Sequence, residues 1–429
     1  MRKSLLTLAP LALGAFVGSA LADDSSVTLY GILDVGIATI DKSRNASDSF
    51  PVTLDNFDPY ALDVTHRLTT MVNGPLSDSR WGVRGKEDLG GGMNVFFVLE
   101  SGFNLPTGQN NNAALSQIQG SNGGGNINAD SSLSGQLFNR AANVGISDAS
   151  IGSFSFGRNN APGFDVIGAY DPQKGSQLFS PLGFSGSAGG ALGYTEVLRD
   201  DNSVRYDNKI DNFNVRALYK FGNIAGSNSA GRGIGINVGY EAAGFGIQAA
   251  AQSYKDVLAT LGTATTATNP QGVKGVLYDT AGFMVAGKYK FGDATLKAGY
   301  ENYKRKGSTD SAAGLGGITE FGYTFSTTAG NLTAYTGADK NYKVYWIGGD
   351  YNVAQNTNLA LGYYQITLDA AEGVKSSDQK WMSLVVDHTL SKRTDVYAGL
   401  DHQTISGAAF AVGYPTGVNV LAMGMRHRF

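Results

Sequence analysis

The amino-acid sequence predicts an all-β fold, a transmembrane barrel of sixteen antiparallel strands, from three observations. Apolar and polar residues alternate along segments of about ten residues, as expected of strands with one face toward lipid and the other toward water. The connections between these segments are either tight turns or long polar stretches. Glycine accounts for 59 of 429 residues, aromatic residues for 10% and charged residues for only 16%. With 42% hydrophobic residues, the chain is too apolar to be disordered.

Residues 1–22 have the pattern of a secretory signal peptide, and the expected mature chain, residues 23–429, is a single barrel domain. Two basic residues near the start precede a mostly apolar run, and Ala20-Leu21-Ala22 is an A-x-A cleavage signal. A membrane helix is the alternative, but the run is short for one. No later segment contains 18 uninterrupted apolar residues. An exported chain without a spanning helix can cross a membrane only as a closed barrel.

Alternation with a period of two residues defines the strands. For example, Phe283 and Val285 lie on one face of their segment, and Lys288 and Lys290 lie on the other. An even number of strands permits closure, which removes both edges of the sheet. Sixteen strands also leave an aqueous channel, whereas eight would be filled by side chains. The expected strands cover residues 26–40, 79–88, 93–104, 138–148, 152–159, 202–208, 212–221, 233–242, 245–254, 279–291, 294–304, 342–353, 357–367, 379–390, 394–404 and 417–429.

The connections are expected to separate the two sides of the membrane, with short turns in the periplasm and long loops outside the cell. Residues 317–336 alternate as well and are a candidate for an extra hairpin within a long loop. The short connections lie near residues 87–92, 148–152, 208–212, 242–244, 291–293, 354–357 and 391–394. The long ones lie near residues 41–78, 105–137, 160–201, 222–232, 255–278, 305–341, 368–379 and 405–416.

Seven segments, in order from Ser25 to Phe429, resemble the general porins of β- and γ-proteobacteria, and those of the trimeric, sixteen-stranded Neisseria and Burkholderia type above all. The resemblance implies a homotrimer in the outer membrane, with the third long loop folded into the barrel as a constriction. It also implies that Phe429 is part of an assembly signal. The segments are SSVTLYGILDVGI (25–37), SRWGVRGKEDLGGG (79–92), FVLESGFN (97–104), FGR (156–158), DNSVR (201–205), LSKRTDVYAG (390–399) and GMRHRF (424–429).

The same resemblance implies that arginines on the barrel wall oppose acidic groups at the constriction. The matching positions are Arg80, Arg140 and Arg205, with Glu100 as the acid on the neighbouring strand. Alternation independently places Arg80, Arg205 and Glu100 opposite apolar neighbours, and a charge on the lipid face would cost about 2–4 kcal/mol. For Arg140 alternation does not decide. A solvated charge at a strand end or loop edge is the alternative for each arginine.

Two acids of the third long loop are candidates to oppose these arginines, and either Asp165 or Asp171, or both, is expected to face them across the constriction. Opposite charges across a pore would orient polar solutes and sort ions by sign. Ordinary solvated loop carboxylates are the alternative. Arg84 is a candidate for a further wall charge or for a rim residue, and Arg158 is expected at the rim because it follows the lipid-facing parity of its strand.

The sequence therefore predicts an outer-membrane porin, a water-filled channel for passive diffusion of small hydrophilic solutes and ions. A solute-specific channel for sugars or anions, or a binding protein that acts through its long loops, is the alternative. A ladder of lumen aromatics would favour sugar specificity. The aromatics on lumen-facing parities are dispersed along the chain, at Tyr254, Tyr303, Trp346, Tyr364 and Trp381.

Other classes of function lack support in the sequence. There is no cysteine, and the four histidines are scattered, so neither a metal site nor a cofactor is expected. The hydrolase, phosphate-loop and zinc-protease motifs are absent, which argues against an enzyme. A formal charge of −3 gives no reason to expect nucleic acid as a partner. The expected partners are identical subunits, outer-membrane lipid and lipopolysaccharide.

Overall fold

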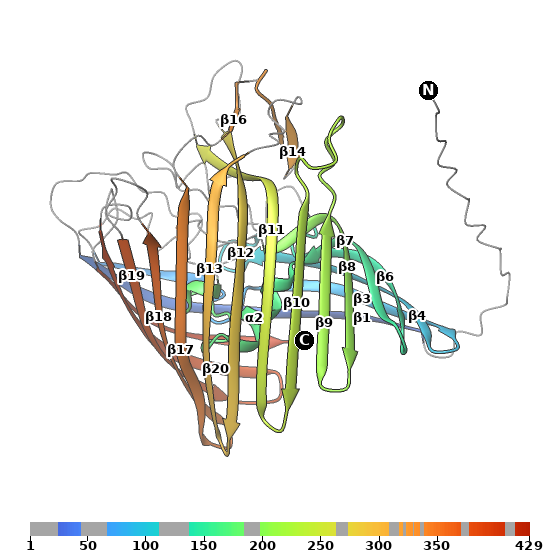
Figure 1. Ribbon diagram of the computed structural model, residues 1–429. Coiled ribbons are helices and arrows are strands. Elements are labelled where there is room, and N and C mark those ends of the chain that lie inside the picture. The colour runs from blue at the N-terminus through green and yellow to red at the C-terminus, as the bar shows by residue number, and fades with distance from the viewer. Residues whose placement is uncertain are drawn as a thin grey trace, which may run out of the picture.

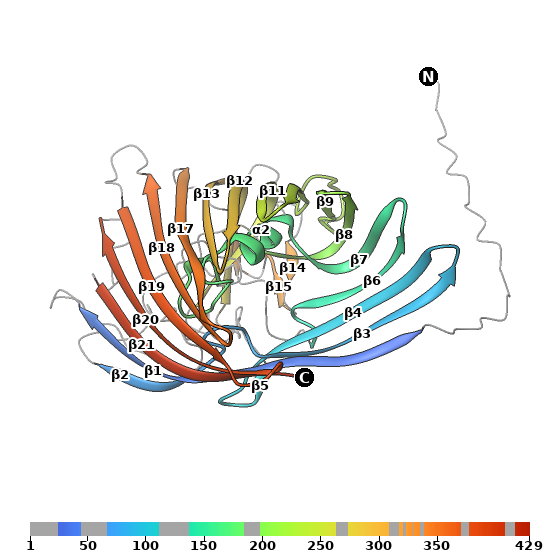
Figure 2. The same cartoon turned by 90° about the horizontal axis from the view of Figure 1, so that it is seen from below.

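The strands of the computed structural model form one closed barrel with a short helix inside it (Figures 1 and 2). The structure describes residues 25–43, 67–110, 137–183, 198–262, 273–308, 317–320, 323–328, 330–334, 339–369, 377–407 and 417–429. The expected signal peptide, residues 1–22, lies outside these described residues.

Sixteen strands make up the barrel wall, as predicted, and each is antiparallel to its neighbours. The barrel closes where the first strand pairs with the last, from Ile32 opposite Arg428 to Ser43 opposite Gly417. The wall strands are β1 (Ser26–Ser43), β3 (Arg80–Gly90), β4 (Met93–Asn104), β6 (Ala141–Asp148), β7 (Gly152–Asn160), β8 (Arg199–Ile210), β9 (Phe213–Lys220), β10 (Gly233–Ala242), β11 (Phe245–Gly262), β12 (Val273–Phe291), β13 (Ala294–Gly307), β17 (Lys340–Ala354), β18 (Thr357–Asp369), β19 (Ser377–Thr389), β20 (Thr394–Ser406) and β21 (Gly417–Arg428).

Five short strands lie within the expected long loops. β2 (Leu68–Asn73) pairs with β1, β5 (Gln109–Asn110) pairs with β4, and β16 (Leu332–Ala334) runs parallel to β12. β14 (Ile318–Glu320) and β15 (Tyr323–Phe325) form a small antiparallel pair, which agrees with the extra hairpin expected in residues 317–336.

β11 and β12 extend into the segment that was expected to be a loop, residues 255–278. The register of their pairing shifts between Tyr254 and Val257, and Asp256 at this bulge has a φ of 52°. A bulge inserts an extra residue into one strand and therefore breaks the alternation on which a strand prediction depends. The strands continue beyond this break.

The two faces of the wall differ as alternation predicts. In β10, Ile234, Ile236 and Val238 are exposed on the outside, whereas Gly235 and Asn237 are buried on the inside. The buried hydrophobic residues form two clusters within the barrel. The interior is therefore packed along part of its wall, and the packing partner is a chain segment that enters the barrel.

This segment contains the helix α2 (Pro162–Tyr170) and the 3-10 helix η1 (Pro181–Gly183). Ala161 is extended and Pro162 occupies the first turn, where its missing N–H costs nothing. The helix ends at Asp171, which is extended and precedes Pro172, because a residue before proline disfavours the helical region. α2 lies inside the ring of strands (Figure 2). None of the helices in the described part of the chain is long and apolar enough to cross a membrane.

Candidate pore constriction

The chain between β7 and β8 folds into the barrel, and we call its described residues 161–183 the inner loop. Its helix α2 packs against β10, β11 and β12 through Val166, Ile167 and Tyr170, all of which are buried. Polar contacts fix the helix at both ends. The side chain of Gln252 accepts a hydrogen bond from the N–H of Gly163 at 2.6 Å. The indole N–H of Trp346 donates to the carbonyl of Tyr170 at 3.1 Å.

The second half of the inner loop continues along the wall. The side-chain amide of Gln173 donates to the hydroxyl of Ser383 in β19 at 3.0 Å. Leu178 and Phe179 are buried in a cluster formed with residues of β1, β19, β20 and β21. The N–H of Leu178 also donates to the carbonyl of Pro75 at 3.0 Å. The inner loop thus follows the wall from β10 round to β21, while β3, β4 and β6 lie across the lumen from α2 (Figure 2).

Glu100 is the centre of a charged group on this opposite wall. Its carboxylate accepts hydrogen bonds from the Nε of Arg140 at 2.6 Å and the hydroxyl of Tyr30 at 2.9 Å, and the Nε of Arg80 lies 3.8 Å away. Arg140 also contacts Asp78 at 2.5 Å. The structure therefore brings three of the expected constriction residues together, and adds Tyr30 and Asp78, which were not expected.

A glycine makes this arrangement possible. Gly82 of β3 lies directly opposite both Tyr30 of β1 and Glu100 of β4. A Cβ at Gly82 would lie 2.8 Å from the hydroxyl oxygen of Tyr30. Any larger residue at this position would therefore displace the tyrosine from the carboxylate, since real Cβ contacts are longer.

Arg84 lies on the same face of β3 as Arg80 and is exposed. Its guanidinium stands 5.1 Å from the centre of the Tyr30 ring, in the geometry of a cation–π contact. No described acid forms an ion pair with it. This group, which we call the wall cluster, consists of Arg80, Arg84, Arg140, Glu100 and Asp78. Its three arginines face two carboxylates, so its formal charge is +1.

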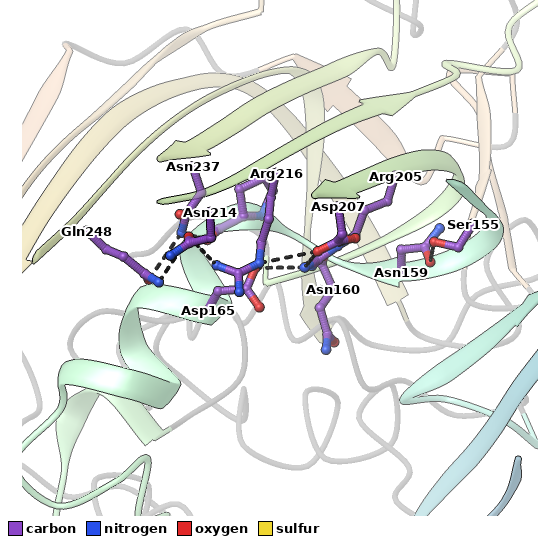
Figure 3. A network of polar contacts seen from close by, with 12 residues as sticks. Ser155, Asn159, Asn160, Asp165, Arg205, Asp207, Asn214, Arg216, Asn237 and Gln248 are labelled. Atoms are coloured by element: carbon purple, nitrogen blue, oxygen red, sulfur yellow. Dashed lines mark hydrogen bonds and ion pairs between the residues drawn. The ribbon is translucent and has the colours of Figure 1, made fainter. Parts of the chain in front are cut away.

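Arg205 belongs to a second charged group, at the base of the inner loop (Figure 3). It binds both carboxylate oxygens of Asp207, at 2.7 and 2.6 Å, and one oxygen of Asp165 at 2.9 Å. Arg216 of β9 lies 3.2 Å from Asp207 and 3.7 Å from Asp165. Two arginines face two acids, so this group is formally neutral. We call it the loop-base cluster.

The structure places Asp165 of α2 beside Arg205. The contact is a direct ion pair that holds α2 to β8 and β9, with no gap between the charges. Burial raises the pKa of Asp165 above its ordinary value, while Arg205 and Arg216 oppose this effect.

Asp171 has different partners from Asp165. Its carboxylate is fully buried and accepts hydrogen bonds from the hydroxyl of Tyr364 at 2.5 Å and the N–H of Gly175 at 2.7 Å. These partners lie on β18 and within the loop itself, so the side chain points away from the arginines. Burial raises its pKa above the ordinary value. Asp171 fixes the bend after α2 to the wall.

A family model described as Gram-negative porin matches residues 7–408 of the chain. The chain belongs to this family. It is 37% identical over 210 residues to an outer membrane porin protein of Bordetella pertussis. This match covers 49% of this porin, and it spans less than half, 44%, of the length of that relative. It is 27% identical to outer membrane porin protein 32 of Delftia acidovorans over the full length of both chains. The fold resembles an anion-selective porin from Comamonas acidovorans, with a TM-score of 0.63, 23% identity, and coverage of 95% of this chain and 100% of that chain. The porin is accordingly an outer-membrane protein.

The sequence prediction did not include several charged residues that the structure brings together, although the alternation of the strands indicated the position of two of them. Arg216 and Asp207 lie on the lumen-facing parity of their strands, and only their pairing required the structure. Arg158 was expected at the rim, but a bulge between Gly157 and Asn159 turns it inward. It is 6% exposed and pairs with Asp201 at 2.7 Å. Alternation cannot follow a strand through a bulge.

The lumen aromatics of the porin are not dispersed in space. Tyr303, Trp346, Tyr364 and Trp381 belong to one buried cluster that packs against α2. Tyr254 is buried separately and donates to Asp200 at 2.8 Å. Because these rings lie beneath the inner loop, they are packing residues and do not line an open path. Among the described residues, no group of three potential ligands is placed to hold a metal ion.

Proposed function

We propose that the porin forms a water-filled channel through which small hydrophilic solutes and ions cross the outer membrane by passive diffusion. Its constriction lies between the inner loop and the wall formed by β3, β4 and β6. The observation that carries this proposal is the division of the lumen. One side is filled by the inner loop, and the side opposite α2 carries the partly exposed charges of the wall cluster.

We further propose a weak preference for anions. The wall cluster has a formal charge of +1, and Arg84 is exposed without a described acidic partner. The two acids expected to balance it from the inner loop are engaged elsewhere, Asp165 with Arg205 and Asp171 with Tyr364. Fixed positive charge in a narrow aqueous passage favours the entry of anions over cations.

General diffusion is the better supported of the two channel types. A sugar-specific channel needs aromatic faces exposed along the solute path, and the aromatics that were candidates for such a ladder are buried under the inner loop. The size dependence of uptake would separate the two types. Liposome swelling with sugars of increasing size should show a smooth cutoff, whereas selective, saturable entry of one sugar would contradict general diffusion.

The remaining expectations about assembly are also proposals. We propose that residues 1–22 are cleaved on export, that residues 23–429 form one domain, that the porin is a homotrimer, that it contacts lipopolysaccharide, and that it has no enzymatic activity. For Phe429 as an assembly signal, the support is its place at the barrel seam. Its backbone exchanges two hydrogen bonds with Gly31 of β1, both at 3.1 Å. Deletion of Phe429 should reduce barrel assembly, and normal insertion would contradict this role.

Reversal potentials in planar bilayers test the constriction. Under a salt gradient, Arg80→Ala and Arg84→Gln should each shift the reversal potential toward cation preference, because each removes one positive charge from the wall cluster. Lys392→Gln is the matched control, since this exposed lysine lies in the short turn between β19 and β20. If both wall variants retain the wild-type reversal potential, the wall cluster is not the constriction.

A further inference from the structure

The wall position next to β1 is occupied by two strands in turn, β2 and β3, and the chain leaves the wall between them. Between the two pairings β1 has only Leu33 and Asp34, whereas the facing segment has six residues, 74–79, which we call the wall insert. Pro75 and Leu76 of this insert are buried against the inner loop. The wall insert therefore projects into the lumen.

Asp34 holds the wall insert at its base. Its side chain is fully buried, and one carboxylate oxygen accepts hydrogen bonds from the N–H groups of Leu76 at 3.0 Å and Ser77 at 2.6 Å. The other oxygen accepts a hydrogen bond from the hydroxyl of Tyr397 in β20. The hydroxyl of Ser79, at the end of the insert, donates to the carbonyl of Asp34 at 2.9 Å and accepts from its N–H at 3.0 Å. Hydrogen bonds to a carboxylate are stronger than those between neutral groups, so Asp34 fixes the backbone of the insert.

The wall insert carries an acid to the wall cluster. The carboxylate of Asp78 lies 2.5 Å from the guanidinium of Arg140, and 14% of the Asp78 side chain is exposed. The two acids of the inner loop, Asp165 and Asp171, are engaged elsewhere. Among the described residues, the acid that joins Glu100 beside the wall arginines therefore comes from the wall insert.

The wall insert also contacts the inner loop, so that one short segment touches both boundaries of the passage. The carbonyl of Pro75 accepts hydrogen bonds from the N–H of Leu178 at 3.0 Å and the hydroxyl of Ser176 at 2.8 Å. Leu76 belongs to the same buried cluster as Leu178. These contacts, together with those of the carboxylate at the base, limit how far Asp78 can move.

We propose that Asp78 is a specificity-determining residue of the passage and that Asp34 is the positioning residue that holds it there. Asp78 offsets one positive charge of the wall cluster and so limits the preference for anions. A fixed charge acts on passing ions over a Debye length, about 8–10 Å, so its effect depends on where it is held. The wall insert has no regular structure of its own, and its position depends on Asp34. This inference rests on the proposed channel and its constriction.

Reversal potentials in planar bilayers test the role of Asp78. Asp78→Asn should raise the anion-to-cation permeability ratio about twofold or more, because it removes one negative charge from the wall cluster. Asp401→Asn is the matched control, since it makes the same change at a buried acid of β20 that is hydrogen-bonded to Gln403. The control should keep the wild-type ratio. An equal rise in the control, or no rise in Asp78→Asn, would overturn the role of Asp78.

The role of Asp34 is tested through its influence on Asp78. In the Asp34→Ala protein, the effect of Asp78→Asn on the permeability ratio should fall to less than about half, because a released insert no longer holds Asp78 beside Arg140. Asp34→Asn keeps an oxygen that can accept from the N–H groups of the insert, so most of the effect should be retained. A full effect in Asp34→Ala would refute the positioning role. So would an equal loss in both Asp34 variants, because the charge of Asp34 would then matter and its hydrogen bonds would not.

Two further variants keep the outcomes distinct. Ser79→Ala removes the hydroxyl that bonds to the backbone of Asp34 and leaves the charge unchanged. It should reduce the effect of Asp78→Asn, and it decides the test if Asp34→Ala does not insert into the bilayer. Arg80→Ala separates this inference from the channel proposal. A shift in Arg80→Ala without any influence of Asp34→Ala refutes the positioning role alone, whereas no shift in either Arg80→Ala or Asp78→Asn refutes the constriction itself.

Discussion

The two sides of the lumen share the same strand geometry but differ in the side chains that face inward. Along β10 to β21, inward-facing positions hold apolar and aromatic side chains that pack against the inner loop. Along β3 and β4, the corresponding positions hold the charges of the wall cluster. On the packed side, residues approach so closely that a Cβ at Gly399 would lie 2.6 Å from the ring of Phe179. The difference places close packing and partly exposed charge on separate parts of one wall.

Removal of a large packing residue should disturb the packed side most strongly. Trp346 is 2% exposed and holds α2 through its indole N–H. Trp346→Ala should lower the free energy of unfolding by about 3–5 kcal/mol, as is typical of buried aromatic truncations. It should also raise single-channel conductance, because the inner loop loses its anchor. Urea unfolding in detergent and bilayer recording are the measurements.

The control for this variant is a tryptophan that does not touch the inner loop. Trp81 of β3 lies next to Phe138 and is only partly buried. Trp81→Ala should leave conductance unchanged and cost less stability. An unchanged conductance in Trp346→Ala would show that the inner loop does not limit the channel.

The loop-base cluster lies at the boundary between the two sides, and its ion pairs should be coupled. Arg205→Gln should destabilise the porin by about 1–3 kcal/mol, since the acids it binds stay partly buried. In the double variant Arg205→Gln/Asp165→Asn, part of this loss should be recovered. A double-mutant cycle built from unfolding curves measures the coupling energy, and strict additivity would mean that the pair does not hold α2 to the wall.

On the charged side, loss of a hydrogen bond should affect stability little. Tyr30→Phe removes the hydroxyl that donates to Glu100, and we expect a loss of about 1 kcal/mol because the site is partly exposed. Conductance should stay near the wild-type value. A loss of unfolding free energy as large as that expected for Trp346→Ala would contradict the distinction between a packed and a charged side.

The smallest expected effect is a dependence on pH. Burial raises the folded-state pKa of Asp171 above its unfolded value. The contribution of this carboxyl to loop attachment is therefore fully present below the unfolded pKa and is lost as pH rises through the folded pKa. Open-channel noise should rise over this interval in the wild type. Asp171→Asn should remove the dependence, and an identical pH profile in both proteins would contradict the anchoring role.

Local patterns made the wall predictable and left the inner loop largely unpredictable. β10 begins and ends where alternation predicted, at Gly233 and Ala242, because successive side chains point to opposite faces and their polarity indicates which face is which. The helix α2 has only nine residues and lies in a glycine- and proline-rich stretch, so the sequence shows no helical period that would predict it. The extensions of β11 and β12 were missed because a bulge interrupts the alternation.

The candidate site shows the same limit at the level of single residues. The resemblance to porins predicted that Arg80 and Glu100 belong to one site, and in the structure they lie close together on paired strands that are neighbours in the sequence. Arg140 could not be placed by alternation because it directly precedes β6. The contact of Asp171 could not be predicted because its partner, Tyr364, is far away in the chain, and only the path of the inner loop determines which wall the side chain meets.

The wall cluster also has a genetic consequence. All five members of the wall cluster fall within residues 78–140, whereas the packing partners of the inner loop are spread over β10 to β21 and β1. A single recombination that exchanges this stretch between related porins would replace the charges at the passage and keep the packed wall intact. The preference of such a channel for anions or cations can therefore be gained or lost by exchange of one contiguous piece of coding sequence.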